Sequence, residues 1–204
     1  MAVTKKTVAK KPAVKKEKDW KKAALADLKK YVDDKGLKIV RSEDEEFTAE
    51  SGDAEYRVFK SYDSAKREAE RYVEEMIEEM PESFSSDFMQ EHYYVTDTDR
   101  RLVANDMADS AMENEGLTDD DEEYQEKYDE VYDEWYERLG EDPIYFLIEE
   151  QGMYSSPSEI SFLVINEKEA AEEAVRIDGI AHFLSSYDGE EIELAGSAVA
   201  YRTN

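Results

Sequence analysis

The sequence predicts an α+β fold with a mainly helical body, short antiparallel strands that include a C-terminal hairpin, and a disordered basic N-terminal tail. Three observations predict it. Apolar residues recur at spacings of three and four through several long stretches, which is the pattern of amphipathic helices. Shorter runs alternate apolar and polar residues, as half-buried strands do. Lysine dominates the first 18 residues, whereas the rest of the 204-residue chain carries 14 Tyr, seven Phe and two Trp, enough for a real core.

The predicted tail covers the first 18 residues, which contain seven Lys and one Glu, with Pro12 among them. Because like charges repel and nothing in the segment can pack, we expect it to be disordered. The segment resembles the Lys/Ala/Pro tails of DNA-associated proteins. It is typical either of a solubilising arm or of a weak nonspecific contact with nucleic acid or with an acidic surface. Residues 19–204 are predicted to form a single acidic domain, with a boundary near residues 152–158 as the alternative.

Helices and strands alternate in the first half of the domain. Gly36 ends the first helix, and Asp63 is a good N-cap for a second helix that Pro81 ends. In chain order, the elements are a helix from residue 19, a strand at 37–40, an acidic turn at 42–53, a strand at 55–60 that we expect to pair with the first, and a helix at 63–80.

The second half is predicted to be mostly helical and to end in a hairpin. Residues 82–96 fit no single pattern, and the final turn falls at Ala195 and Gly196. The elements are helices at 97–114, 118–139 and 142–151, a strand at 160–165, a helix that Asn166 caps and that runs to residue 176, a helix at 179–187, and hairpin strands at 191–194 and 198–201.

Several functional classes find no support in the composition. The chain has no Cys and only two His, His92 and His182, and it lacks phosphate loops, nucleophile elbows and zinc-protease motifs. We therefore predict no catalytic residue, no metal site and no cofactor, although carboxylates acting with a divalent metal are a further alternative. No run approaches the roughly 18 apolar residues that a membrane helix needs, and the N-terminus lacks the apolar segment of a secretory signal. We expect a cytoplasmic protein with no membrane contact.

Charge is the most informative property of the sequence. The chain has 53 acidic and 26 basic residues, a net charge of −27, which averages +6 in the first 18 residues and −33 in residues 19–204. A body this acidic repels phosphate and attracts basic surfaces. The sequence therefore predicts a basic protein partner, in particular a nucleic-acid-binding enzyme.

The predicted helix at 118–139 concentrates this charge. Four tyrosines recur at every fourth position, Tyr124, Tyr128, Tyr132 and Tyr136, and eleven acids surround them. Acids at positions i and i+4 lie about 6 Å apart along a helix, which is close to the spacing of phosphates on DNA. They also repel one another. Two interpretations remain open: a solvated face over a tyrosine-rich core stripe, or an acidic surface presented to a basic groove.

Two further regions share the acidic bias, the helix at 63–80 and the turn at 42–53, so the sequence suggests that acidity is global. The predicted partner-binding residues lie on the two helices. They are Asp119, Asp120, Glu122, Glu123, Glu126, Asp129, Glu130, Asp133, Glu134 and Glu137, together with Glu70, Glu74 and Glu78.

Residues 160–204, with a short helix and hairpin joined through Asp188 and Gly189, resemble small acidic proteins of tailed phages and mobile elements. By charge, size and tyrosine-rich acidic helices the chain also resembles DNA-mimic antirestriction proteins. That resemblance implies a non-enzymatic inhibitor that occupies the DNA groove of a host defence enzyme, in the host cytoplasm. The alternative is a phage accessory or virion-associated structural protein, whose basic tail contacts DNA or another subunit.

Overall fold

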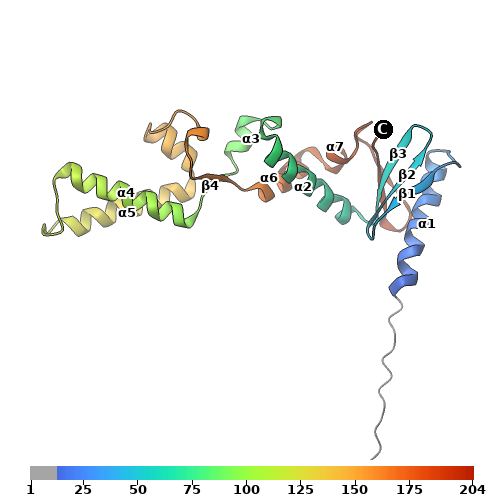
Figure 1. Ribbon diagram of the computed structural model, residues 1–204, viewed down its shortest axis with the longest axis horizontal. Helices are drawn as coiled ribbons and strands as arrows, with labels where there is room; N and C mark the ends of the chain where they lie inside the picture. The colour runs from blue at the N-terminus through green and yellow to red at the C-terminus, as the bar shows by residue number, and fades with distance from the viewer. Residues whose placement is uncertain (1–12) are drawn as a thin grey trace, which may run out of the picture. The chain divides into compact units, whose positions relative to one another are not determined.

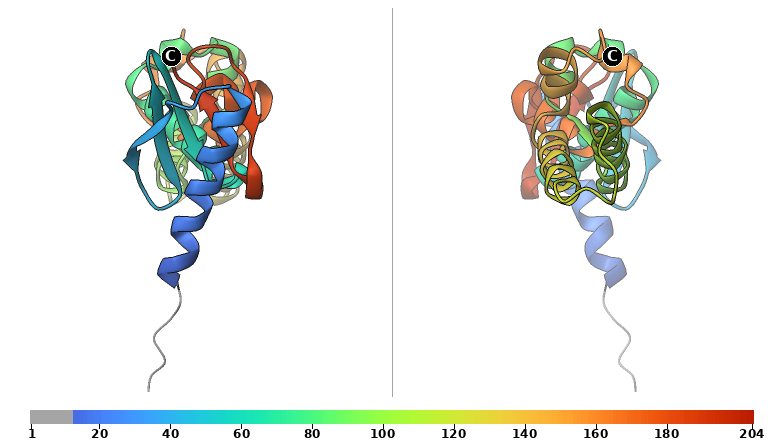
Figure 2. Two further views of the ribbon diagram at one scale, coloured as in Figure 1. Left: turned by 90° about the vertical axis from the view of Figure 1, so that its right-hand side faces the viewer. Right: turned by 90° about the vertical axis from the view of Figure 1, so that its left-hand side faces the viewer.

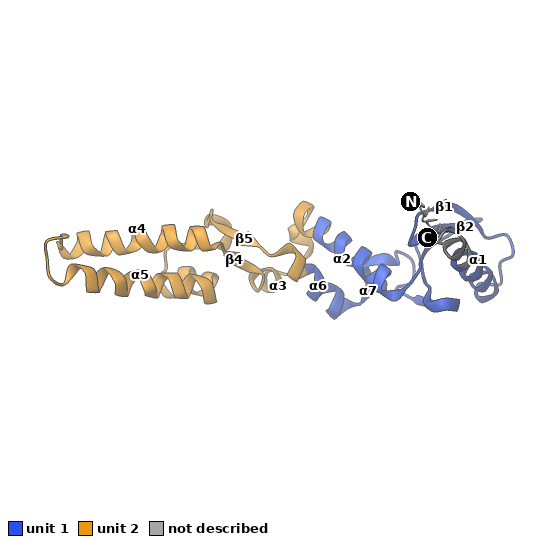
Figure 3. Ribbon diagram, turned by 90° about the horizontal axis from the view of Figure 1, so that it is seen from below, with its two compact units in different colours: residues 1–75, 171–204 blue, residues 76–170 orange. Residues whose placement is uncertain are grey.

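The computed structural model describes residues 13–204, with side chains from Trp20 onward (Figure 1). The chain divides into two compact units, coloured separately in Figure 3. The first unit comprises Met1–Glu75 and Ala171–Asn204, and the second comprises Met76–Ala170. The predicted disorder of residues 1–12 lies outside the described residues, and the prediction of one domain over residues 19–204 stays a prediction.

An antiparallel five-stranded sheet with the order β1-β2-β3-β7-β6 is the centre of the first unit. Helix α1 lies along one face of this sheet (Figure 2). The elements of the unit are α1 (Ala13–Tyr31), β1 (Lys38–Ser42), β2 (Glu46–Ser51), β3 (Ala54–Phe59), most of α2 (Tyr62–Glu79) and of α6 (Glu167–Asp178), α7 (Ile180–Leu184), β6 (Glu191–Glu193), the 3-10 turn η4 (Ala195–Ser197) and β7 (Val199–Arg202).

Alternation along the strands explains the core of this unit. Phe47 on β2 and Val58 on β3 are register partners and are fully buried, and Ala24 and Leu28 of α1 pack against them. Successive side chains of a strand point to opposite faces, so Arg57, next to Val58, lies on the other face with Phe59. The sheet therefore has one apolar face under α1 and one face that carries charge.

Two helices, α4 (Asp97–Glu115) and α5 (Tyr124–Glu141), dominate the second unit and run side by side in Figures 1 and 3. At one end Trp135 and Leu139 of α5 pack with Phe146 and Leu147 in a single core. The remaining elements are η1 (Pro81–Ser83), α3 (Ser86–Gln90), β4 (Tyr93–Val95), the π-helix η2 (Tyr145–Glu150), η3 (Pro157–Glu159) and β5 (Leu163–Ile165), with β4 and β5 paired antiparallel.

The predicted α+β class with antiparallel strands and a C-terminal hairpin, β6–β7, is confirmed. Three details of the prediction were wrong. Helix α1 begins at residue 13, within the predicted tail, because Pro12 stands where a helix can start and Lys and Ala favour helix. The acidic turn at 42–53 contains strand β2, which pairs with β1. The strand at 55–60 therefore pairs with β2 and β7, and not with β1.

Candidate acidic interaction surface

Net charge is divided very unequally between the two units. The first unit has 24 acidic and 21 basic residues, a net charge of −3, whereas the second has 29 acidic and five basic residues, a net charge of −24. The suggestion of global acidity was therefore wrong. A surface for a basic partner belongs on the second unit.

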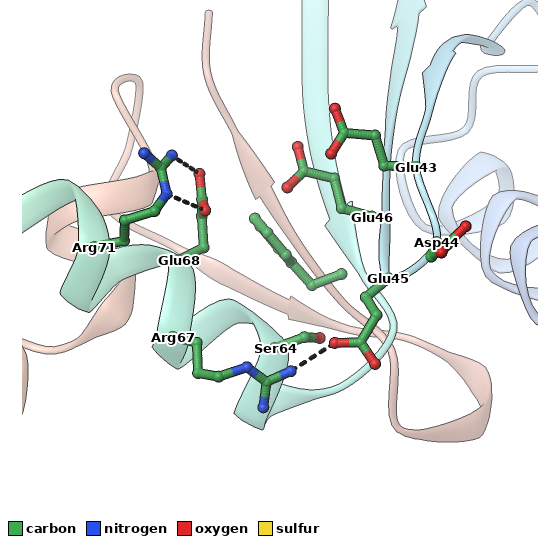
Figure 4. Close-up of a pocket in the computed structure, with 9 residues that line it drawn as sticks. Glu43, Asp44, Glu45, Glu46, Ser64, Arg67, Glu68 and Arg71 are labelled. Carbon is green, nitrogen blue, oxygen red and sulfur yellow. Dashed lines mark hydrogen bonds and ion pairs between the residues drawn. The ribbon is translucent and has the colours of Figure 1, made fainter.

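Acids of the predicted turn at 42–53 are largely paired inside the first unit (Figure 4). Glu45 accepts Arg67 at 2.5 Å and lies 3.7 Å from Lys60. Glu46 lies 3.0 Å from Arg57. The paired bases come from β3 and α2, so the local sequence of the turn gives no sign of them. This cluster is an ion-pair network and not a free acidic surface.

Arg57 links two carboxylates in this network, Glu46 and Glu68 at 3.0 and 2.7 Å, and Arg71 also holds Glu68 at 2.7 Å. Burial raises the pKa of Glu68, but hydrogen bonds from Arg71 and Arg57 outweigh it and hold the pKa below its usual value. The pKa of Arg57 is raised: burial lowers it, and its hydrogen bonds to the two carboxylates more than offset that. Both groups stay charged and paired at neutral pH.

The predicted acids of α2 do not form one outward face. Glu70 is only 17% exposed in its side chain and lies 3.1 Å from Lys66, one turn earlier on the helix. Glu74 is half-buried, and Glu78 is exposed. Glu70 and Glu74 belong to the first unit, whereas Glu78 belongs to the second.

The predicted helix at 118–139 begins six residues late, at Tyr124. Gly116 adopts a left-handed conformation, with φ of 72°, and ends α4. Thr118 then donates from its backbone N and its hydroxyl to one carboxylate oxygen of Asp121, at 2.8 and 3.0 Å. Such local bonds compete with helix formation. Four predicted site residues therefore lie in the exposed loop between α4 and α5: Asp119, Asp120, Glu122 and Glu123.

The other predicted acids share one exposed side of α5. At 3.6 residues per turn they lie within an arc of about 140°, opposite buried Trp135 and Leu139. None of them has a salt bridge within 4.0 Å in the described part of the chain. We call this surface the α5 acidic face; it consists of the predicted Glu126, Asp129, Glu130, Asp133, Glu134 and Glu137, and of Glu141, which sequence reasoning missed.

Tyrosines fix α5 to α4 beneath this face. The predicted spacing places them in two stacked pairs, Tyr124 with Tyr128 and Tyr132 with Tyr136, with ring centroids 5.9 Å apart in each pair. The Tyr128 hydroxyl donates to Asn105 at 2.9 Å, and the Tyr136 hydroxyl donates to Asp97. Desolvation raises the pKa of Tyr124 and of Tyr128, and neighbouring aspartates add to the rise. The rings are half-buried, so they act as a bridge between helices more than as a core stripe.

Few bases offset the acids of the α4–α5 hairpin, which we define as residues 97–141. It contains 18 acidic and four basic residues. Arg101 lies 3.0 Å from Asp97, Lys127 pairs with Glu115, and Arg138 pairs with Glu150. Arg100 donates from Nε to the Tyr136 carbonyl at 3.0 Å, with its guanidinium 4.0 Å from the Tyr136 ring centroid. All four bases are thus engaged elsewhere, and the α5 acidic face is uncompensated.

Gly140 makes room for this arginine, because a Cβ there would lie 2.4 Å from Arg100 Cζ. We expect Gly140→Ala to lower the free energy of unfolding by about 1 kcal/mol: alanine favours helix by about 1 kcal/mol, but the lost bonds to a charged group are worth about 1.5–3 kcal/mol. In an Arg100→Met background the same change should stabilise by about 1 kcal/mol. A double-mutant cycle by urea unfolding measures both, and the same sign in both backgrounds contradicts the account.

No other chemistry gathers in the described residues. Among residues 13–204, no group of three or more His, Asp or Glu residues could hold a metal ion, and no helix is both long and apolar enough to cross a membrane. His92 is buried and lies 4.8 Å from the Phe88 ring, whereas His182 is exposed beside Phe183. Comparison with protein families, with curated proteins and with solved structures finds no match to this chain.

Proposed function

We propose that the chain is a non-enzymatic protein that binds a basic, DNA-binding partner through the α4–α5 hairpin and thereby excludes DNA. One observation carries the proposal: the second unit has a net charge of −24 against −3 for the first, and the bases of its hairpin are all engaged away from the α5 acidic face. In the first unit the clustered acids are matched by bases. The excess is thus local to a surface with a defined shape.

Charge density on this surface is similar to that of a DNA strand. The α5 acidic face places seven carboxylates between Glu126 and Glu141. Those residues span a rise of about 22 Å, hence one charge per about 3.5 Å. One strand of duplex DNA carries a phosphate per about 3.4 Å of axis. A groove that follows a phosphate backbone can therefore meet a comparable row of carboxylates.

The same face costs stability, because acids three or four residues apart on a helix repel. A chain under selection for folding alone gains by placing lysine among them. Retention of the repulsion is consistent with a basic partner, whose bases neutralise the carboxylates on binding. Because the face is exposed, affinity should fall steeply as salt screens the attraction.

Inhibition of DNA cleavage tests this function. We define an α5-face variant, Glu126→Gln, Glu130→Gln, Asp133→Asn and Glu137→Gln. The control variant makes the same change in net charge at four exposed acids of the first unit: Asp53→Asn, Asp178→Asn, Glu190→Gln and Glu193→Gln. We expect wild type and the control variant to inhibit at least one member of a panel of purified restriction–modification enzymes. The α5-face variant should be about 10- to 100-fold weaker, if each lost charge removes a few tenths to 1 kcal/mol of attraction.

Two results contradict the proposal. One is that the wild-type chain inhibits no enzyme of the panel. The other is that the α5-face variant, with an unchanged circular dichroism spectrum, inhibits as strongly as the control variant.

A further inference from the structure

A groove of about 740 Å³ lies in the second unit, between α3, the C-terminal end of α5 and η2. Sequence reasoning gave no sign of it, because its lining residues come from segments that are far apart in the chain. Its carboxylates lie in α3, beside it, and around η2: Asp87, Glu91, Glu141, Asp142 and Glu149. No Lys or Arg lines it, so the groove is negative along its length.

Its remaining surface is largely apolar and aromatic. Ile144 is buried and Ile148 is half-buried, and both line the groove. Tyr93 and Tyr145 line it as well, and Tyr145 is 52% exposed, so its ring is accessible to a bound molecule. Carboxylates beside apolar and aromatic side chains suit a ligand that is cationic at one end and aliphatic along its stem.

The acids of the groove are available to such a ligand. Asp142 accepts one hydrogen bond from the Tyr145 backbone N at 3.0 Å. The other four carboxylates are exposed, and none has a salt bridge within 4.0 Å in the described part of the chain. Glu141 belongs both to the groove and to the α5 acidic face, so the two surfaces are continuous.

We propose that the groove binds an arginine side chain of the basic partner. This inference rests on the proposed function and names the anchor of that interaction. The methylene stem of arginine packs against apolar side chains while its head stays polar. Its planar guanidinium stacks on tyrosine and bonds carboxylates in a bidentate manner, whereas the ammonium of lysine is a compact and strongly hydrated point charge. The chemistry of the groove therefore favours arginine over lysine.

Salt separates the groove from the α5 acidic face. Attraction to the open face is screened by added salt. Stacking and apolar contact in the groove are not electrostatic in the same degree and should persist. The affinity that remains at high salt therefore comes from the groove, and it should depend on arginine.

Fluorescein-labelled hexa-arginine and hexa-lysine serve as probes in anisotropy titrations with the full chain. At about 0.5 M salt, where the Debye length is only a few Å, we expect hexa-arginine to bind about tenfold more tightly, as expected for one partly desolvated cation–π contact. The groove variant, Glu91→Gln, Glu141→Gln and Glu149→Gln, should lose this preference. The matched variant on α5, Glu126→Gln, Glu130→Gln and Glu134→Gln, should keep it.

Tyr145→Leu keeps an apolar side chain at an exposed position and leaves every charge in place, so it provides a second variant should the triple change disturb folding. It should also lower the preference for arginine. Equal binding of the two peptides to wild type at high salt overturns the inference, and so does an equal loss of preference in the groove and α5 variants. Inhibition of DNA cleavage that depends on the α5 acidic face, without any preference for arginine, leaves the proposed function standing and refutes the groove alone.

Discussion

Truncation of Trp135 to alanine is expected to lower the free energy of unfolding of the second unit by about 3–5 kcal/mol, the usual cost of removing a buried large aromatic side chain. Trp135 is 6% exposed and packs edge-on against Phe146, with ring centroids 4.8 Å apart. Leu139, one turn later on α5, belongs to the same core. The change removes the contact that joins α5 to the π-helix η2. Urea unfolding followed by circular dichroism at the helix band measures the loss.

Leu102 provides the control for this prediction. It lies on the neighbouring helix α4 and is 56% exposed, so Leu102→Ala should cost less than about 0.5 kcal/mol. If the two changes destabilise the chain equally, Trp135 does not belong to a packed core and the described position of α5 is wrong.

Neutralisation of the α5 acidic face has the second large expected effect, and it is a gain in stability. Eight pairs of acids between Glu126 and Glu141 stand three or four residues apart, and the α5-face variant removes the repulsion in all of them. At about 0.2–0.5 kcal/mol per pair, less the favourable contribution of Glu126 in the first helical turn, the net gain should be about 1–3 kcal/mol at low salt. Thermal and urea unfolding at low and high salt measure it.

High salt provides the internal test of this prediction. Near 1 M salt the Debye length falls to about 3 Å, and the stability of the variant and of wild type should converge. The first-unit control variant should change stability little at either salt concentration, because its four acids are widely separated in the chain. A variant that is less stable than wild type at low salt indicates that the carboxylates are engaged within the fold, contrary to the account.

Helix periodicity predicted much of the second unit, because an amphipathic helix is specified by residues close in sequence. The tyrosines spaced by four are stacked, and the acids from Glu126 to Glu137 lie opposite Trp135. The start of α5 was wrong because Thr118 and Asp121 form a local bonded turn, which competes with helix at the residues where the sequence suggested a cap.

Contacts between distant segments account for what the sequence did not reveal. Glu45 and Glu46 read as a free acidic turn until Arg57 and Arg67 are placed beside them by β3 and α2. The pairing of β2 with its neighbours was missed because its alternating residues lie within an acidic run. The concentration of charge in residues 76–170 was present in the sequence, but it becomes evident only when the limits of the second unit are known.

Displacement of DNA from a bound enzyme tests the central claim most directly. A fluorescent duplex, held by a restriction–modification enzyme that the wild-type chain inhibits, has high anisotropy. Addition of the wild-type chain or of the first-unit control variant should lower the anisotropy to that of the free duplex, and the α5-face variant should fail to do so at the same concentration. If the duplex stays bound while the enzyme is inhibited, or if the α5-face variant displaces it equally well, the acidic face of α5 does not take the place of DNA.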